Sequence, residues 1–131
     1  MTAEAVILII EDNPRNLKLV RDILRHLGYD TLEADTAEEG IELARSHLPE
    51  LTLMDVQLPG MDGVDAVARL RAEPETAELV VVALTALAMK EDRERCLAAG
   101  FDGYLEKPIE VSRFPEQIAG FLAGAGAGAS T

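Results

Sequence analysis

Residues 6–28, VILIIEDNPRNLKLVRDILRHLG, contain the pattern that decides the fold. The stretch opens with five consecutive apolar residues, Val6–Ile10, as expected for a parallel strand that is covered on both faces. Asn13 and Pro14 follow, a pair that favours a helix N-cap and a first-turn proline. From Leu17 onward, apolar residues recur at three- and four-residue spacing, which places them on one helix face. The stretch therefore predicts one strand followed by one amphipathic helix.

The same unit occurs five times along the chain. Helical patterns separate five apolar runs, which are Val6–Ile10, Thr31–Ala34, Leu51–Met54, Leu79–Leu84 and Gly103–Leu105. Thr36 and Glu39 form a capping-box pattern for the second helix, and the last helix is expected to begin near Ser112. Gly40 lies inside the second helical pattern, where glycine costs roughly 1 kcal/mol relative to alanine. The alternation predicts an α/β fold with a parallel sheet and right-handed crossovers.

Length and composition exclude several classes of protein. The 131 residues correspond to about one domain, expected over 1–123, with a disordered Gly/Ala tail over 124–131. A net charge of −12 argues against a nucleic-acid binder, because such proteins neutralise phosphates with cations. The lone Cys96 forms no internal disulfide, His26 and His47 form no zinc pattern, and the first apolar run is too short to cross a membrane. We expect a cytoplasmic protein without membrane insertion.

Charged and polar residues stand where the predicted strands end. The first strand ends at Glu11 and Asp12, the third at Asp55 and the fourth at Thr85, and the fifth ends just before Lys107. In open α/β sheets this edge carries the ligand site. Three converging carboxylates repel one another unless a cation joins them, and oxygen ligands favour Mg²⁺.

The same residue types favour phosphoryl chemistry. A lysine beside the cation is suited to a phosphoryl oxygen, and a threonine hydroxyl can donate to a second oxygen. Positioning and charge stabilisation supply most of the catalysis in phosphoryl transfer. An aspartate can itself be the nucleophile and form an aspartyl phosphate.

These motifs resemble the signature of response-regulator receiver domains in two-component signalling. The resemblance rests on the segments Glu11-Asp12-Asn13, Met54-Asp55, Leu58–Gly63, Leu84-Thr85-Ala86 and Lys107-Pro108, in that order. It implies a flavodoxin-like, doubly wound (βα)5 fold with strand order 2-1-3-4-5. Residues 82–90, with Lys107–Ile109 and Phe114, are similar to the stand-alone DivK type of receiver, which has no output domain.

The resemblance also implies roles for single residues. Asp55 would accept the phosphoryl group, with Thr85 and Lys107 completing the catalytic set. Asp12, Asp55 and the backbone carbonyl of Gln57 would hold Mg²⁺, for which Mn²⁺ can substitute, while Glu11 would act through water. Thr85 and Tyr104 would move together as the switch, and Gln57 and Leu87 would flank the path of the attacking water. The family often has a cis bond at the position of Lys107–Pro108, although most X–Pro bonds are trans, so the sequence leaves this bond undecided.

Simpler interpretations compete with some of these roles. Asp62 is expected to set turn geometry or cap the following helix, and Cys96 to be a buried small hydrophobe. The first helix carries a local charge of +3, from Arg15, Lys18, Arg21 and Arg25 against Asp22. Either this surface is simply solvated, or Arg15, Lys18, Leu19 and Arg21 dock the phosphodonor.

Three functions fit the sequence. The first is a phosphorylation-controlled switch that is not an enzyme in its own right. Its donor would be a sensor histidine kinase or a histidine phosphotransfer protein, and a downstream protein would bind the face formed by the fourth helix, fifth strand and fifth helix. The second is a phosphate relay or sink, and the third a magnesium-dependent phosphohydrolase, which usually needs an aspartate where Gln57 stands. We expect a monomer or weak dimer that binds no nucleic acid.

Overall fold

In the computed structural model, which describes residues 5–58, 60–86 and 90–127, five strands form one parallel sheet. The strands are β1 (Val6–Ile10), β2 (Asp30–Ala34), β3 (Leu51–Asp55), β4 (Val81–Thr85) and β5 (Gly103–Glu106). Their order across the sheet is β2-β1-β3-β4-β5, as predicted. Five helices alternate with them: α1 (Pro14–His26), α2 (Ala37–His47), α3 (Gly63–Ala72), α4 (Lys90–Ala99) and α5 (Phe114–Ala127). This is the flavodoxin-like (βα)5 arrangement.

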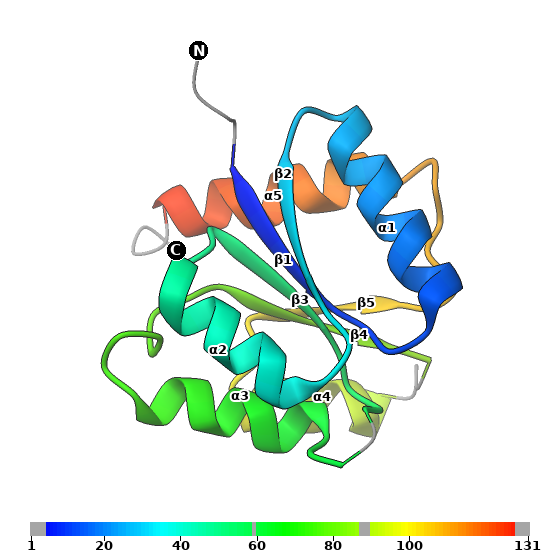
Figure 1. Ribbon diagram of the computed structural model, residues 1–131. Helices are drawn as coiled ribbons and strands as arrows, with labels where there is room; N and C mark the ends of the chain where they lie inside the picture. Colours follow the sequence, from blue (N-terminus) through cyan, green and yellow to red (C-terminus); the bar gives the residue numbers. More distant parts are fainter. Residues whose placement is uncertain (1–4, 59, 87–89, 128–131) are drawn as a thin grey trace.

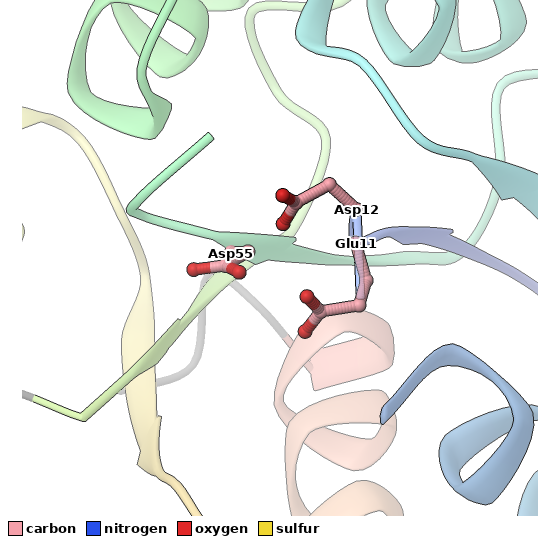
Figure 2. Close-up of side chains that lie close together, drawn as sticks. All are labelled: Glu11, Asp12 and Asp55. Carbon is pink, nitrogen blue, oxygen red and sulfur yellow. The ribbon is translucent and has the colours of Figure 1, made fainter. Parts of the chain in front are cut away.

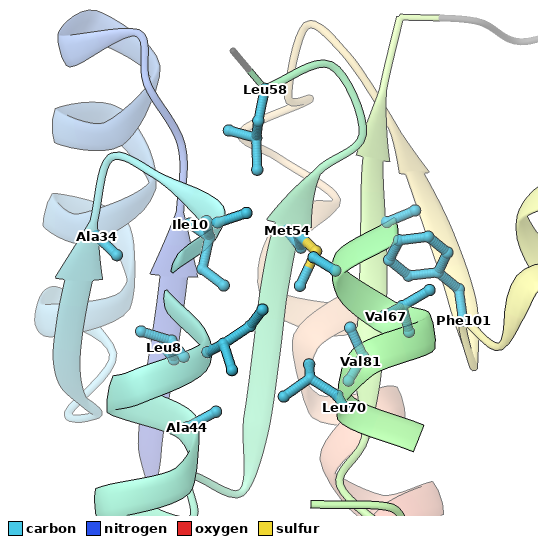
Figure 3. Close-up of a cluster of buried hydrophobic side chains, with 14 of the residues drawn as sticks. Leu8, Ile10, Ala34, Ala44, Met54, Leu58, Val67, Leu70, Val81 and Phe101 are labelled. Atoms are coloured by element: carbon cyan, nitrogen blue, oxygen red, sulfur yellow. The ribbon is translucent and has the colours of Figure 1, made fainter. Parts of the chain in front are cut away.

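The helices cover both faces of the sheet (Figure 1). On one face, α1 and α5 bury a cluster that includes Leu24, Leu53 and Phe114. On the other, α2, α3 and α4 enclose a second cluster around Leu8, Met54 and neighbouring side chains (Figure 3). Burial on both faces explains why most residues of β1, β3 and β4 are apolar.

The predicted capping residues lie where the sequence indicated. The Asn13 side chain accepts from the backbone N–H groups of Arg15 and Asn16 at the start of α1. The Thr36 hydroxyl accepts from Glu39 N–H at the start of α2, and Asp62 caps α3 by accepting from Asp65 N–H. These bonds satisfy donors that a helix N-terminus otherwise leaves unpaired.

Gly40 has a packing role that outweighs its cost in a helix. A β-carbon at this position would overlap the side chain of Ile10, which is fully buried in β1. Glycine therefore lets α2 lie close against the sheet.

Several boundaries differ from the prediction by one or two residues: β2 begins at Asp30, β3, β4 and β5 each end one residue later, and α5 begins at Phe114 rather than near Ser112. Two further differences concern the start of β4 and the end of α5. The fourth strand was expected from Leu79 but begins at Val81. Leu79 instead belongs to the preceding turn, where its N–H donates to Thr76 O and its carbonyl accepts from Arg71. The helix α5 continues to Ala127, into the segment for which a Gly/Ala tail was expected. The last four residues of the predicted tail lie outside the described residues.

Cys96 is buried in the core, as expected. The sequence left the Lys107–Pro108 bond undecided, and the structure has it cis. His26 and His47 lie in the last turns of their helices. Among the helices that the structure describes, none is long and apolar enough to cross a membrane.

Candidate functional site

The carboxyl ends of β1 and β3 bring three carboxylates together. The two strands are neighbours, with Ile10 opposite Met54, so the residues that follow them meet at the same edge of the sheet. One carboxylate oxygen from each of Glu11, Asp12 and Asp55 lies within 4.8 Å of the other two. Figure 2 shows Glu11 and Asp12 leaving β1 on the side where Asp55 ends β3. The strand order reverses at this point, which is where doubly wound sheets place their ligands.

The environment of the cluster fits a small divalent cation. The Glu11 side chain is fully buried, and within the described residues its Oε1 atom has an ion-pair partner in Lys107. Asp55 is also buried, whereas Asp12 is exposed and leaves the cluster open to solvent. Burial raises the pKa of the Glu11 carboxyl, an effect that Lys107 opposes and Asp55 reinforces. Carboxylate oxygens with one open side are the ligands that Mg²⁺ prefers.

Lys107 places a positive charge between two of these carboxylates. Its Nζ lies 2.8 Å from Asp55 Oδ2 and 2.8 Å from Glu11 Oε1. Burial alone would lower the pKa of the Lys107 ammonium, but the two carboxylates outweigh burial and the pKa is raised. The lysine therefore remains charged at neutral pH and can face either a carboxylate or a phosphoryl oxygen.

Backbone hydrogen bonds fix the ends of β3, β4 and β5 relative to one another. Val56 N–H donates to Leu84 O at 3.0 Å, and Lys107 N–H donates to Thr85 O at 2.9 Å. Thr85 is buried at the end of β4, on the strand beside Asp55. The sequence prediction that Asp55, Thr85 and Lys107 share one edge of the sheet is therefore confirmed.

The loop after β3 is anchored to Asp55 itself. Gln57 N–H donates to Asp55 Oδ1 at 2.9 Å, and Gly63 N–H donates to Val56 O at 2.8 Å. The Gln57 side chain is exposed. That its carbonyl ligates a metal stays a prediction, and Leu87, the other residue expected beside the water path, lies outside the described residues.

Tyr104 lies apart from the carboxylates, on the part of β5 that α4 covers. Its hydroxyl accepts from Arg93 Nη1 at 2.9 Å, and the guanidinium carbon lies 5.4 Å from the ring centroid. Sequence reasoning did not identify Arg93. Its contact with Tyr104 depends on how α4 packs on β5, a tertiary relationship for which the sequence carries no local signal.

The charged face of α1 is less positive than its own sequence indicates. Lys18 pairs with Asp22 at 2.6 Å, as the i, i+4 spacing allows. However, Arg21 and Arg25 each lie 3.4 Å from Glu33, which belongs to the neighbouring strand β2. With this second carboxylate the local charge is +2 rather than +3.

Arg15, Lys18 and Leu19 remain exposed on this helix, near the carboxylate end of the sheet. Arg21 is only partly exposed, because Glu33 holds it against β2. The surface offers two outward cations beside an apolar side chain.

Comparisons with known proteins agree with this geometry. The family model for the response regulator receiver domain matches residues 7–119. The chain is 42% identical over 119 residues to the polar-differentiation response regulator DivK of Brucella ovis, covering 91% of this chain and 97% of that protein.

Solved structures show the same similarity. The receiver domain of a sensor histidine kinase from Pseudomonas aeruginosa PAO1, solved with a magnesium ion coordinated in its active site cleft, is 33% identical with a TM-score of 0.83. That match covers 91% of this chain and 98% of the other. The signal receiver domain of a histidine kinase from Syntrophus aciditrophicus is 29% identical with a TM-score of 0.82, covering 92% and 91%.

Proposed function

The chain belongs to the response regulator receiver domain family, and from this premise we propose that it is a switch in which Asp55 accepts a phosphoryl group. The donor would be a phosphohistidine on a sensor histidine kinase or a phosphotransfer protein. The observation that carries the proposal is the arrangement around Asp55: a buried carboxylate with Lys107 at 2.8 Å and two further carboxylates within 4.8 Å.

The transfer breaks the P–N bond of the donor phosphohistidine and forms a P–O bond to a carboxylate oxygen of Asp55. The donor imidazole leaves with the electron pair of the broken bond. Gln57 N–H already donates to Asp55 Oδ1, which fixes the carboxylate while it attacks. The Lys107 ammonium faces the other oxygen and can stabilise charge on the incoming phosphoryl group.

Asp12, Asp55 and the carbonyl of Gln57 would hold Mg²⁺, with Glu11 acting through water. The ion supplies charge neutralisation and orientation for the phosphoryl oxygens. The burial of Glu11 supports this assignment, because a buried carboxylate beside a second one needs more than a single lysine to compensate its charge.

Phosphorylation would act on the rest of the molecule through Thr85 and Lys107. It replaces one negative charge with about two and adds acceptor oxygens that both side chains can follow. A groove of about 530 Å³ between β5 and α5 is lined by residues that include both Lys107 and Tyr104. A movement of the Lys107 side chain would therefore alter this groove. The groove lies beside the α4–β5–α5 face, where a downstream protein would bind.

Of the two other functions, the phosphohydrolase fits the site less well, whereas a relay or sink fits it equally. A phosphohydrolase usually places a second aspartate where Gln57 stands, and the exposed Gln57 amide cannot act as a general acid. A relay or sink would use the same chemistry at Asp55 but would need no output face.

A pull-down separates the switch from the relay. Protein treated with beryllofluoride and Mg²⁺, which imitates a phosphorylated aspartate, is compared with the Asp55→Asn variant treated in the same way. The switch predicts a partner that is enriched only on the treated wild-type protein. Identical partners in both samples would contradict the switch and favour the relay.

A further inference from the structure

The contact between Arg93 and Tyr104 joins α4 to β5 through a single side chain. Arg93 donates to the hydroxyl at 2.9 Å while its guanidinium carbon lies 5.4 Å from the ring centroid. A cation within about 6 Å of a ring centroid is attracted to the π face. Arg93 therefore contacts both the hydroxyl and the ring of Tyr104.

Tyr104 and Thr85 point to the same face of the sheet. In the parallel pairing, Tyr104 lies opposite Ala83, and Thr85 is the next residue of β4 on that side, because side chains alternate along a strand. Tyr104 also packs against the core cluster that α4 covers, which contains Ala83 and Cys96. A displacement of Thr85 would therefore change the space on the side of the sheet where Tyr104 lies.

We propose that Arg93 is a positioning residue that holds Tyr104 in its resting place, so that switching the α4–β5–α5 face requires this contact to break. The inference rests on the proposed function and adds a restraint to it. Both side chains are only partly exposed, so the contact lies at the edge of the core rather than in open solvent.

Arg93 also has an anionic neighbour on β5, the Glu106 carboxylate. Glu106 lies two residues beyond Tyr104 on the same face of β5, opposite Thr85. The Tyr104 hydroxyl, and to a smaller extent the Glu106 carboxylate, raise the pKa of Arg93. Within the described part of the chain Arg93 and Glu106 form no ion pair, so the bond that Arg93 makes to β5 is the one to Tyr104.

Removing the Arg93–Tyr104 contact is expected to shift the equilibrium between the resting and active states. A contact made only in the resting state weighs against the active state, so its removal shifts the equilibrium toward that state. By reciprocity, a ligand that favours the active state then binds more tightly. One cation–π contact and one hydrogen bond together correspond to a change of roughly five- to seventyfold.

The composition of the chain makes Tyr104 directly observable. There are two tyrosines and no tryptophan, so a Tyr29→Phe background leaves Tyr104 as the only tyrosine. Tyr29 lines a separate cavity with Pro49, Leu79 and Leu122. Phenylalanine is chosen at this position because it keeps the ring that fills part of that lining. Acrylamide quenching without Mg²⁺ reports the exposure of Tyr104, and a beryllofluoride titration with Mg²⁺ reports the switch.

In this background, Arg93→Ala is compared with Arg95→Ala. Arg95 lies on the same helix but pairs with Asp92 at 2.9 Å and has a 70% exposed side chain. We expect Arg93→Ala to increase quenching and to lower the half-saturating beryllofluoride concentration by roughly five- to seventyfold, with Arg95→Ala unchanged.

Equal behaviour of the two variants in both measurements would overturn the inference, as would weaker beryllofluoride binding by Arg93→Ala. If the Tyr29→Phe protein itself takes up no beryllofluoride, the proposed function fails instead. Quenching without Mg²⁺ still decides in that case whether Arg93 restrains Tyr104.

Discussion

The ammonium of Lys107 lies 2.8 Å from Oδ2 of Asp55, and this ion pair joins the ends of β5 and β3 across the intervening strand β4. The lysine compensates part of the negative charge of the carboxylate cluster. Any cation that enters the cluster therefore meets a site that is already partly neutralised.

Replacing Lys107 with methionine removes this charge while keeping the length of the side chain. We expect Mg²⁺ to bind more tightly, by roughly three- to tenfold, because the carboxylates lose a competing cation. Isothermal titration calorimetry measures the change, with Arg113→Met as a control in which an exposed cation is removed. Unchanged or weaker Mg²⁺ binding by Lys107→Met would show that the ammonium does not set the charge of the cluster.

Gly63 is expected to tolerate no side chain. A β-carbon there would lie 2.7 Å from Val56 Cα and 2.8 Å from Asp55 O, both backbone atoms. Gly63→Ala must therefore displace the peptide that follows Asp55, and we predict a loss of about 1–3 kcal/mol in the free energy of unfolding. Urea denaturation with and without Mg²⁺ measures this loss and any weakening of the metal site.

Gly120 provides the matched control in α5. A β-carbon there would meet nothing within 4 Å, so Gly120→Ala should stabilise the helix by about 0.5–1 kcal/mol. Equal effects of the two substitutions would show that the Asp55 peptide does not require glycine beside it.

The outward cations of α1 allow a test of donor docking. We expect Arg15→Glu with Lys18→Glu to slow phosphotransfer from a protein donor by roughly tenfold, because charge complementarity mainly affects association. Phosphorylation by acetyl phosphate should be unchanged, since a small donor needs no docking surface. Arg21 is left in place because Glu33 holds it.

The control for this experiment is Arg95→Glu, a reversal of an exposed charge on α4. Equal transfer rates for the α1 double variant, the control and the wild type would contradict donor docking. The α1 cations would then be ordinary solvated surface residues. The rates are followed by loss of radiolabel from the phosphorylated donor.

The buried thiol of Cys96 is expected to make the free energy of unfolding depend on pH in the alkaline range. Burial raises the pKa of its thiol above the ordinary value of 9.0. For a group whose folded-state pKa is raised, stability is fully present below the unfolded pKa and is lost as the pH rises through the folded value. We therefore expect Cys96→Ala to unfold with a smaller pH dependence than the wild type above pH 9.

Thiol labelling checks the same feature. At neutral pH, an aromatic disulfide reagent should react with Cys96 only in urea. Rapid labelling of the folded protein would contradict its burial.

The positions of the strands could be predicted because this fold makes them conspicuous in the sequence. A parallel strand covered on both faces must be apolar throughout, as Val6–Ile10 is. The same topology brings the carboxyl ends of the strands to one edge of the sheet. Asp55 and Lys107 could therefore be predicted to lie close together, although 52 residues separate them in the sequence.

The remaining features depend on contacts between elements. The beginning of β4 is set by Arg71, whose guanidinium takes the Leu79 carbonyl that a longer strand would have used. Likewise, the charge of α1 depends on Glu33 of β2, and the place of Tyr104 depends on Arg93 of α4. In each case a long side chain reaches from one element to another, and the periodicity of the sequence does not indicate which partner it contacts.

The most direct test of the central claim is the mass of the intact chain after incubation with acetyl phosphate and Mg²⁺. A phosphoryl-accepting Asp55 predicts the addition of one phosphoryl group, which requires Mg²⁺ and is absent in Asp55→Asn. Borohydride trapping followed by peptide mapping should locate the group at residue 55. No uptake by the wild type, or equal uptake by Asp55→Asn, would contradict the assignment.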